Sequence, residues 1–108
     1  MIYEALVYGV WFMYDSKSGF VWRGIGEKWR RTALTPGKTG YYTINVGGRA
    51  HGAHRVIWRI VHGSWPKYEI DHINGNPGDN RLVNLQDVTG QHNRMNTRLK
   101  LKLTRWGW

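Results

Sequence analysis

The pattern of apolar and polar positions along this 108-residue chain predicts short elements separated by turns. Residues 2–13 are apolar without a strict two-residue alternation, so we interpret them as a short helix. Residues 15–19 have the composition of a turn, and residues 20–23 predict a strand. Residues 24–40 combine several cations with Pro36-Gly37, which indicates an irregular loop.

A hairpin and a helix are predicted in the middle of the chain. Gly47-Gly48 separates two β-prone runs within residues 41–51, and this spacing suits a two-residue hairpin turn. Residues 53–62 have apolar side chains at helical spacing, and Gly63 is a suitable residue to end that helix.

The last part of the chain predicts a strand, a polar loop, a second strand and a helix. Residues 69–72 form the first strand, residues 74–80 the loop, and residues 82–88 include the second strand. Thr89 is a suitable N-cap for a helix that we expect to continue to about Leu103. The order of elements predicts an α+β fold, and the length allows one domain with one modest core.

Charge and composition narrow the choice of partner. The chain has 16 Lys and Arg against 7 Asp and Glu, a formal net charge of +9, which favours a polyanion such as nucleic acid. The longest apolar run, residues 5–14, is too short to span a bilayer, so we expect no membrane partner. Cysteine is absent, which excludes disulfides and cysteine-based zinc sites. Nothing in the sequence indicates an obligate protein partner. The seven Trp side chains could fill the core or stack on nucleic-acid bases, and the composition does not decide between these two roles.

The candidate chemistry lies between Asp71 and Asn93. Asp71 and His72 place a hard oxygen ligand beside a titratable nitrogen at a strand end, and the backbone must bend there if both serve one pocket. The amide oxygen of Asn93 could complete a metal site with Asp71, and such oxygen ligands suit Mg²⁺ or Mn²⁺. Asn80 and Asn84, in the loop between, are interpreted mainly as structural residues that satisfy backbone groups.

The run from His54 to Asn96 closely resembles the HNH endonucleases of phages and homing elements. The similarity rests on Asp71-His72, on Asp79-Asn80-Arg81, on Asn84-Leu85 and on a final Asn93, which follow one another at the family's spacings. Weaker similarities upstream extend the resemblance over most of the chain. Where many relatives have His at the last position this chain has Asn93, as in the nicking homing enzymes, which leaves the preferred ion open.

The resemblance implies a ββα-metal fold of two antiparallel strands and a helix around one divalent ion, Mg²⁺ or Mn²⁺. It divides a single domain, residues 1–108, into a strand-rich part (1–52), an HNH core (53–103) and a tail (104–108). It implies that Asp71 and Asn93 are metal ligands, that His72 is the general base, and that Asn84 pins the loop and orients His72. The partner would be double-stranded DNA, cleaved to leave a 5′-phosphate and a 3′-hydroxyl. The implied setting is the cytoplasm of a bacterial host, with a phage as the source of the gene.

Further basic residues follow the motif, and no acid lies among them. Beside a phosphodiesterase site we interpret them as contacts to the DNA backbone in preference to a solvated face. They are Arg94, Arg98, Lys100, Lys102 and Arg105. For His54 we expect a packing or hydrogen-bonding role, with a DNA contact as the second reading.

Two other functions compete with a nuclease. A catalytically inactive HNH-like module would bind DNA without cutting it, but such a module would be expected to lose Asp71, His72 or Asn93, and all three are present. A basic RNA-binding protein or a structural phage protein would carry the Asn-rich loop by coincidence, and it would show no metal-dependent cleavage.

Overall fold

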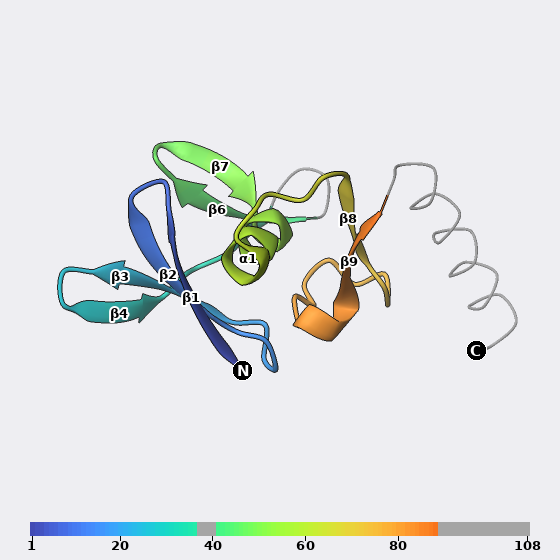
Figure 1. Ribbon diagram of the computed structural model, residues 1–108, viewed down its shortest axis with the longest axis horizontal. Coiled ribbons are helices and arrows are strands. Elements are labelled where there is room, and N and C mark those ends of the chain that lie inside the picture. The colour runs from blue at the N-terminus through green and yellow to red at the C-terminus, as the bar shows by residue number, and fades with distance from the viewer. Residues whose placement is uncertain (37–40, 89–108) are drawn as a thin grey trace, which may run out of the picture.

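The first four strands form one antiparallel sheet. The computed structural model describes residues 1–36 and 41–88 of the chain. Strands pair in the order β1-β2-β3-β4, so that each turn joins neighbours in the sheet (Figure 1). Their bounds are Ile2–Val7 for β1, Val10–Asp15 for β2, Val21–Ile25 for β3 and Lys28–Arg31 for β4.

The helix predicted over residues 2–13 is wrong, because β1 and β2 form a hairpin there. Tyr8 and Gly9 both have positive φ, 49° and 78°, which is the backbone of a two-residue hairpin turn. The two-residue period was hidden because large apolar side chains also occupy the outer face of the hairpin. Leu6 is 47% exposed and Trp11 is 53% exposed.

The irregular loop predicted over residues 24–40 is also wrong in part. Gly26, with φ of 61°, turns the chain between β3 and β4, and Thr35–Pro36 forms the short strand β5. All four residues of β4 are exposed at the sheet edge, so this strand carries cations where a buried strand would carry apolar side chains. Residues 37–40 of the predicted loop lie outside the described part. The strand predicted over residues 20–23 is confirmed, and it continues to Ile25.

The second sheet and the helix agree with the sequence predictions. β6 (Tyr42–Val46) and β7 (Arg49–Gly52) form the hairpin across Gly47-Gly48, and β5 pairs with β6 on its other side. α1 (Ala53–His62) follows directly and ends at Gly63, whose N–H donates to the carbonyl of Arg59 at 3.0 Å.

A two-stranded antiparallel sheet closes the described chain. It consists of β8 (Glu69–His72) and β9 (Leu85–Val88), with a turn of 3₁₀ helix, η1 (Leu82–Asn84), just before β9. Both predicted strands are therefore confirmed, and so is the α+β class. The helix predicted to begin at Thr89 lies outside the described residues, so the third element of the expected ββα motif is not described either.

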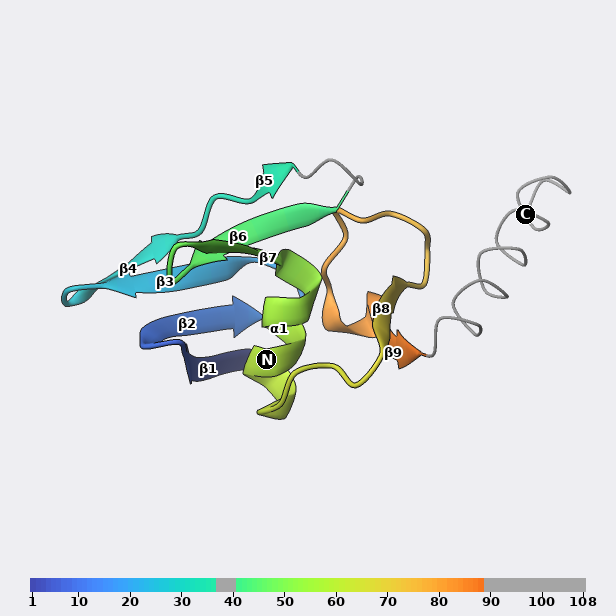
Figure 2. The same cartoon turned by 90° about the horizontal axis from the view of Figure 1, so that it is seen from above.

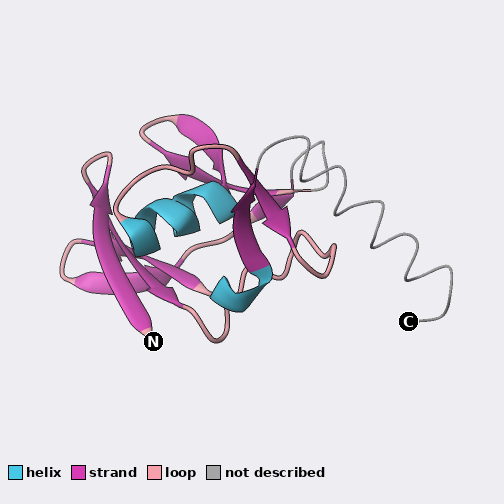
Figure 3. Ribbon diagram, turned by 45° about the vertical axis from the view of Figure 1, so that its right-hand side comes forward, coloured by secondary structure: helices cyan, strands magenta, loops and turns pink. Residues whose placement is uncertain are grey.

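α1 lies between the N-terminal strands and the β8–β9 hairpin, as Figures 2 and 3 show. One apolar cluster joins all of these elements. Val56 and Ile57 on α1 are 0% exposed, and the cluster extends to Phe12 on β2, Ile44 on β6 and Ile70 on β8. The loop and the last hairpin are thus held against the same core as the N-terminal sheet. Among the described helices, none is long and apolar enough to cross a membrane.

The N-terminal sheet is tied to the loop before β9 by polar contacts as well. The hydroxyl of Tyr14, a fully buried residue on β2, donates to the carbonyl of Asn80 at 2.5 Å. Burial raises the pKa of Tyr14 above its usual range, so the hydroxyl remains a donor at neutral pH. Gly19 packs so closely that a Cβ there would lie 2.9 Å from the carbonyl carbon of Asn80.

We expect Gly19→Ala to destabilise the protein far more than Gly9→Ala. Both glycines have nearly the same φ, 81° and 78°, so both variants bear the cost of a left-handed Ala, about 1 kcal/mol. Only at Gly19 does the added Cβ meet backbone atoms, because nothing lies within 4 Å at Gly9. That overlap should cost roughly a further 1–3 kcal/mol. Urea unfolding of the two variants measures the difference, and equal losses would contradict the close approach.

Candidate active site

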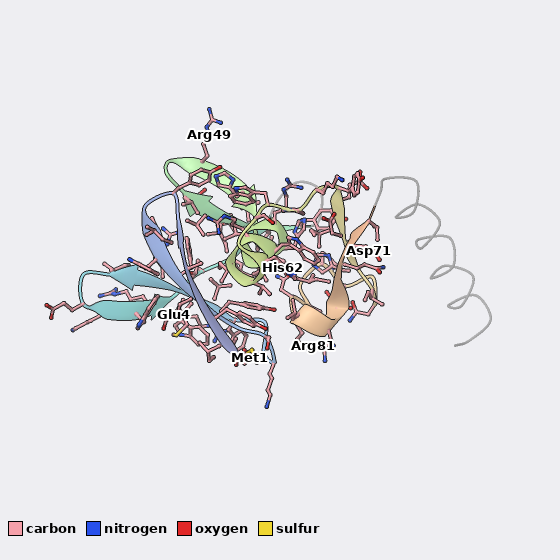
Figure 4. All side chains as sticks on the ribbon, in the orientation of Figure 1. Met1, Glu4, Arg49, His62, Asp71 and Arg81 are labelled. Atoms are coloured by element: carbon pink, nitrogen blue, oxygen red, sulfur yellow. The ribbon has the colours of Figure 1, made fainter. Side chains whose placement is uncertain are left out.

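Asp71 and His72 are buried at the end of β8, 6% and 4% exposed. Across the hairpin Asp71 lies opposite Gln86, whose Nε2 donates to Asp71 Oδ2 at 3.0 Å. Figure 4 shows Asp71 on the β8–β9 hairpin. His72 lies opposite Leu85 and contacts other elements, as expected for consecutive residues of a strand.

The imidazole of His72 is held by Asn80. His72 Nε2 and Asn80 Oδ1 are 2.9 Å apart, and both residues are buried. Because an amide oxygen only accepts, this hydrogen bond requires the proton of a neutral imidazole to be on Nε2. The lone pair is then on Nδ1, the nitrogen that can accept a proton.

Asn84 pins the loop, but the hydrogen bond to the His72 ring comes from Asn80. The Nδ2 of Asn84 donates to Asn74 Oδ1 at 2.9 Å and to the carbonyl of Asp79 at 2.8 Å, and its Oδ1 accepts from the Asn74 N–H at 2.9 Å. Its carbonyl accepts from the N–H of Ile73 at 2.8 Å. The expectation that Asn84 pins the loop agrees with these contacts. Asn84 holds the backbone next to His72, whereas Asn80 bonds the ring. The sequence marks both as loop asparagines, and the pattern of loop hydrogen bonds was needed to separate their roles.

An ion pair stiffens the same loop. Asp79 accepts hydrogen bonds from Arg81 at 2.8 and 2.7 Å and from Asn74 Nδ2 at 2.8 Å. These contacts, Arg81 first, lower the pKa of Asp79 to about 2, so the pair is intact at neutral pH. The loop that carries Asn80 is therefore bonded on both sides of that residue.

Two aromatic rings lie against His72. The ring of His54, near the start of α1, is 5.3 Å from the His72 ring in an edge-to-face arrangement, and the Tyr41 ring is 5.8 Å away. Burial, with smaller contributions from His72 and Arg55, lowers the pKa of His54 to about 4. His54 is therefore uncharged at neutral pH, and the packing role expected for it agrees with this geometry.

The described residues include one side chain whose chemistry suits a divalent ion. Asp71 offers a carboxylate oxygen, a ligand that suits a hard divalent ion such as Mg²⁺. No group of three or more His, Asp or Glu side chains within residues 1–36 and 41–88 could hold an ion alone. The donor chemistry fits an ion that takes Asp71 and further oxygen ligands. Asn93, the expected second ligand, lies outside the described part.

The expected DNA-binding residues also lie beyond the described part of the chain, but the structure has another group of cations. Arg23 on β3, Arg30 on β4 and Arg31 line a groove of about 350 Å³ between the first two sheets. Arg23 and Arg30 are direct cross-strand partners, and no carboxylate lines this groove. Like charges placed opposite one another destabilise a strand pair, so the groove suits an anion.

The interior of this groove contains polar atoms with unused hydrogen-bonding capacity. Among the described residues, Arg23 Nε and the hydroxyl of Thr32 are buried without a hydrogen-bond partner, although a terminal nitrogen of Arg23 donates to the carbonyl of Asn45. Sequence analysis missed the group because residues 24–40 were interpreted as a loop. If Gly26 is interpreted as part of a hairpin turn, the pairing of the two flanking strands places Arg23 opposite Arg30.

We expect the free energy of unfolding to fall as the pH drops from 6.5 to about 4. The pKa of His54 is about 4 in the folded protein and near 6.5 in the unfolded chain, so in that window the unfolded state binds more protons. Above pH 6.5 both states have a neutral ring, and this contribution to stability is complete. The loss should be about 1–3 kcal/mol. Urea unfolding at several pH values should show a smaller loss for His54→Phe, and an equal pH dependence for both proteins would contradict the burial of His54.

Comparisons with known proteins agree with the resemblance in the sequence. Residues 51–95 match the model of a family described as HNH endonuclease. These residues include the end of β7, α1, β8, β9 and the loop of Asn80. A comparison with curated proteins found no significant match.

This chain is similar to a solved structure of the HNH homing endonuclease I-HmuI, an enzyme described as binding and cleaving DNA. Sequence identity is 26% and the TM-score is 0.62, and the match covers 82% of this chain and 53% of that one. This chain thus corresponds to about half the length of that homing endonuclease. The resemblance is confirmed: residues 51–95 match the HNH endonuclease family, and the fold is similar to that of an HNH homing endonuclease.

Proposed function

We propose that this protein is a metal-dependent endonuclease that hydrolyses phosphodiester bonds of double-stranded DNA, one strand at a time. The observation that carries the proposal is the buried pair Asp71-His72, with the imidazole bonded through Nε2 to Asn80 at 2.9 Å. A side chain that only packs needs no fixed tautomer, whereas a general base does. The family match over residues 51–95 supports the same reading.

His72 acts as the general base. With its hydrogen on Nε2, the neutral ring accepts a proton at Nδ1 from a water aligned with the scissile phosphorus. The charge that develops on the imidazole is delocalised over both nitrogens, and Asn80 Oδ1 then accepts a stronger hydrogen bond from Nε2. The oxygen of the water attacks phosphorus as the bond to O3′ breaks. The leaving O3′ takes a proton from solvent water, which gives a 5′-phosphate and a 3′-hydroxyl.

Asp71 and Asn93 would hold one divalent ion, Mg²⁺ or Mn²⁺. Such an ion would stabilise the negative charge that develops as the phosphodiester bond breaks. Gln86 has a positioning role, because its donation at 3.0 Å fixes one carboxylate oxygen of Asp71. A single protein carboxylate leaves the ion with net positive charge, which favours an anionic substrate.

Two sets of cations bind the DNA backbone. The first is the basic run after the motif, Arg94, Arg98, Lys100, Lys102 and Arg105. The second is the groove lined by Arg23, Arg30 and Arg31, where three cations without a carboxylate favour a phosphate. We place the activity in the cytoplasm of a bacterial cell, with a phage as the source of the gene.

We expect the intact protein to nick supercoiled plasmid with Mg²⁺ and to leave it intact with EDTA. His72→Ala should lower the rate by roughly 10²–10⁴-fold, the usual value of a positioned proton acceptor. Asp71→Ala should abolish cleavage while DNA binding persists, because the cations supply most of the affinity.

The matched controls are His62→Ala, an exposed histidine at the end of α1, and Glu69→Ala, an exposed carboxylate on the same strand as Asp71. Both should retain activity. Unaltered cleavage by His72→Ala would refute the base. DNA binding without cleavage by the intact protein under any divalent ion would favour the inactive binding module.

We expect both cation sets to contribute to the salt dependence of DNA binding. Each lost phosphate contact should reduce the slope of log K against log salt by about 0.9. Arg30→Gln with Arg31→Gln should therefore flatten the slope, and so should joint replacement of Arg98, Lys100 and Lys102 by Gln. Both changes should weaken binding to all sequences alike.

Arg49→Gln is the matched control for the groove. Arg49 is an exposed cation on the β6–β7 hairpin, and Figure 4 shows it pointing outward at that end of the molecule. Its removal should leave the slope unchanged. Fluorescence anisotropy from 50 to 300 mM salt measures all three slopes, and an unchanged slope in the groove variant would show that these arginines contact no phosphate.

A further inference from the structure

Three rings meet at the end of β8. The centroids of His54 and His72 are 5.3 Å apart at an interplanar angle of 64°, and Tyr41 lies 4.9 Å from His54 and 5.8 Å from His72. The His54–His72 contact is edge-to-face and the two Tyr41 contacts are tilted, and ring contacts at these distances are favourable and depend on orientation. The His72 ring is therefore bounded by two neighbouring rings in addition to its hydrogen bond.

His54 is itself held in place. It is the second residue of α1, a helix whose Ala53, Val56 and Ile57 are buried in the core. Its ring lies against the backbone of Gly52, where a Cβ would be 2.9 Å from His54 Cε1. Gly52 therefore leaves just enough room for this position of the ring, which is backed by the helix start.

The hydrogen bond to Asn80 fixes His72 incompletely. A bond at Nε2 restrains that nitrogen, but small rotations about the Cβ–Cγ bond move Nε2 little, because it lies close to that axis, and move Nδ1 more. A flat neighbour packed against the ring stops this rotation. His54 meets the requirement, because it belongs to a rigid element and stands at an angle to His72.

We propose that His54 is a positioning residue that fixes the plane of the His72 ring and thereby directs Nδ1 at the attacking water. The inference rests on the proposed function only where it names an attacking water as the group that Nδ1 faces. That His54 fixes the ring plane is independent of catalysis. The role needs a flat side chain at position 54 and no hydrogen bond from it. A histidine that contacted DNA would act on binding instead.

The test compares His54→Ala, His54→Phe and Gly52→Ala in the full-length protein. His54→Ala should lower kcat about 10- to 100-fold, with KM and the Kd for DNA changed less than about threefold, because misorientation affects the chemical step. His54→Phe restores a flat ring and should recover kcat to within about fivefold of the intact protein. Gly52→Ala displaces the ring without removing it and should lower kcat in the same direction.

A second measurement does not depend on activity. The imidazole nitrogen and carbon-bound proton resonances of His72 should shift in His54→Ala and return toward their original positions in His54→Phe. The control is His51→Ala, since His51 stacks on Tyr8 and Trp65 and should affect neither kcat nor the His72 resonances.

Several outcomes would overturn the inference. One is an unchanged kcat in His54→Ala, and another is a raised Kd in both His54 variants, which would assign His54 to DNA. If the intact protein cuts no DNA, the proposed function fails, and the His72 resonances alone then test the positioning role. Unchanged His72 signals in His54→Ala refute that role. A shift in His54→Ala that His54→Phe reverses supports it.

Discussion

The hydrogen bond between Asn80 and His72 is the contact on which the site depends. It selects the imidazole tautomer, and Asn80 can make it only because its own backbone is fixed from the other half of the chain. Tyr14 donates to its carbonyl, and Gly19 packs against it without a side chain. Asn84 and the Asp79–Arg81 pair secure the rest of the loop. The N-terminal sheet thus holds the loop of the candidate site in place, although none of its residues belongs to the Asp-His pair.

Much of the fold could be predicted from local patterns. The hairpin at Gly47-Gly48, α1 and the strands β8 and β9 each carry a period or a turn residue that identifies them. The β1–β2 hairpin could not be predicted from local patterns, because its outer face is nearly as apolar as its inner one. Burial by neighbouring elements decides its structure. β4 was missed for the opposite reason. It lies at an edge with all four residues exposed, so it lacks the alternation of apolar and polar side chains that identifies a half-buried strand.

The positions of the candidate site residues could be predicted from the sequence, but the separate roles of the two loop asparagines could not. Asp71 and His72 were identified by spacing in a family resemblance, and both are buried as a working site requires. The division of work between Asn80 and Asn84 could not be inferred, because two loop asparagines four residues apart have the same chemistry. Only the path of the loop determines which amide faces the ring. The arginine groove was missed likewise, since Arg23 and Arg30 become neighbours only when β3 and β4 pair.

The contact between Tyr14 and Asn80 joins residues 66 positions apart in the sequence. During synthesis, Tyr14 therefore leaves the ribosome well before Asn80, the residue that it contacts. A shorter, partly made chain can form the N-terminal hairpin, but it has no imidazole held in a defined tautomer. Closing so long a loop is entropically costly, and the contact forms late, once the core elements have brought both ends together.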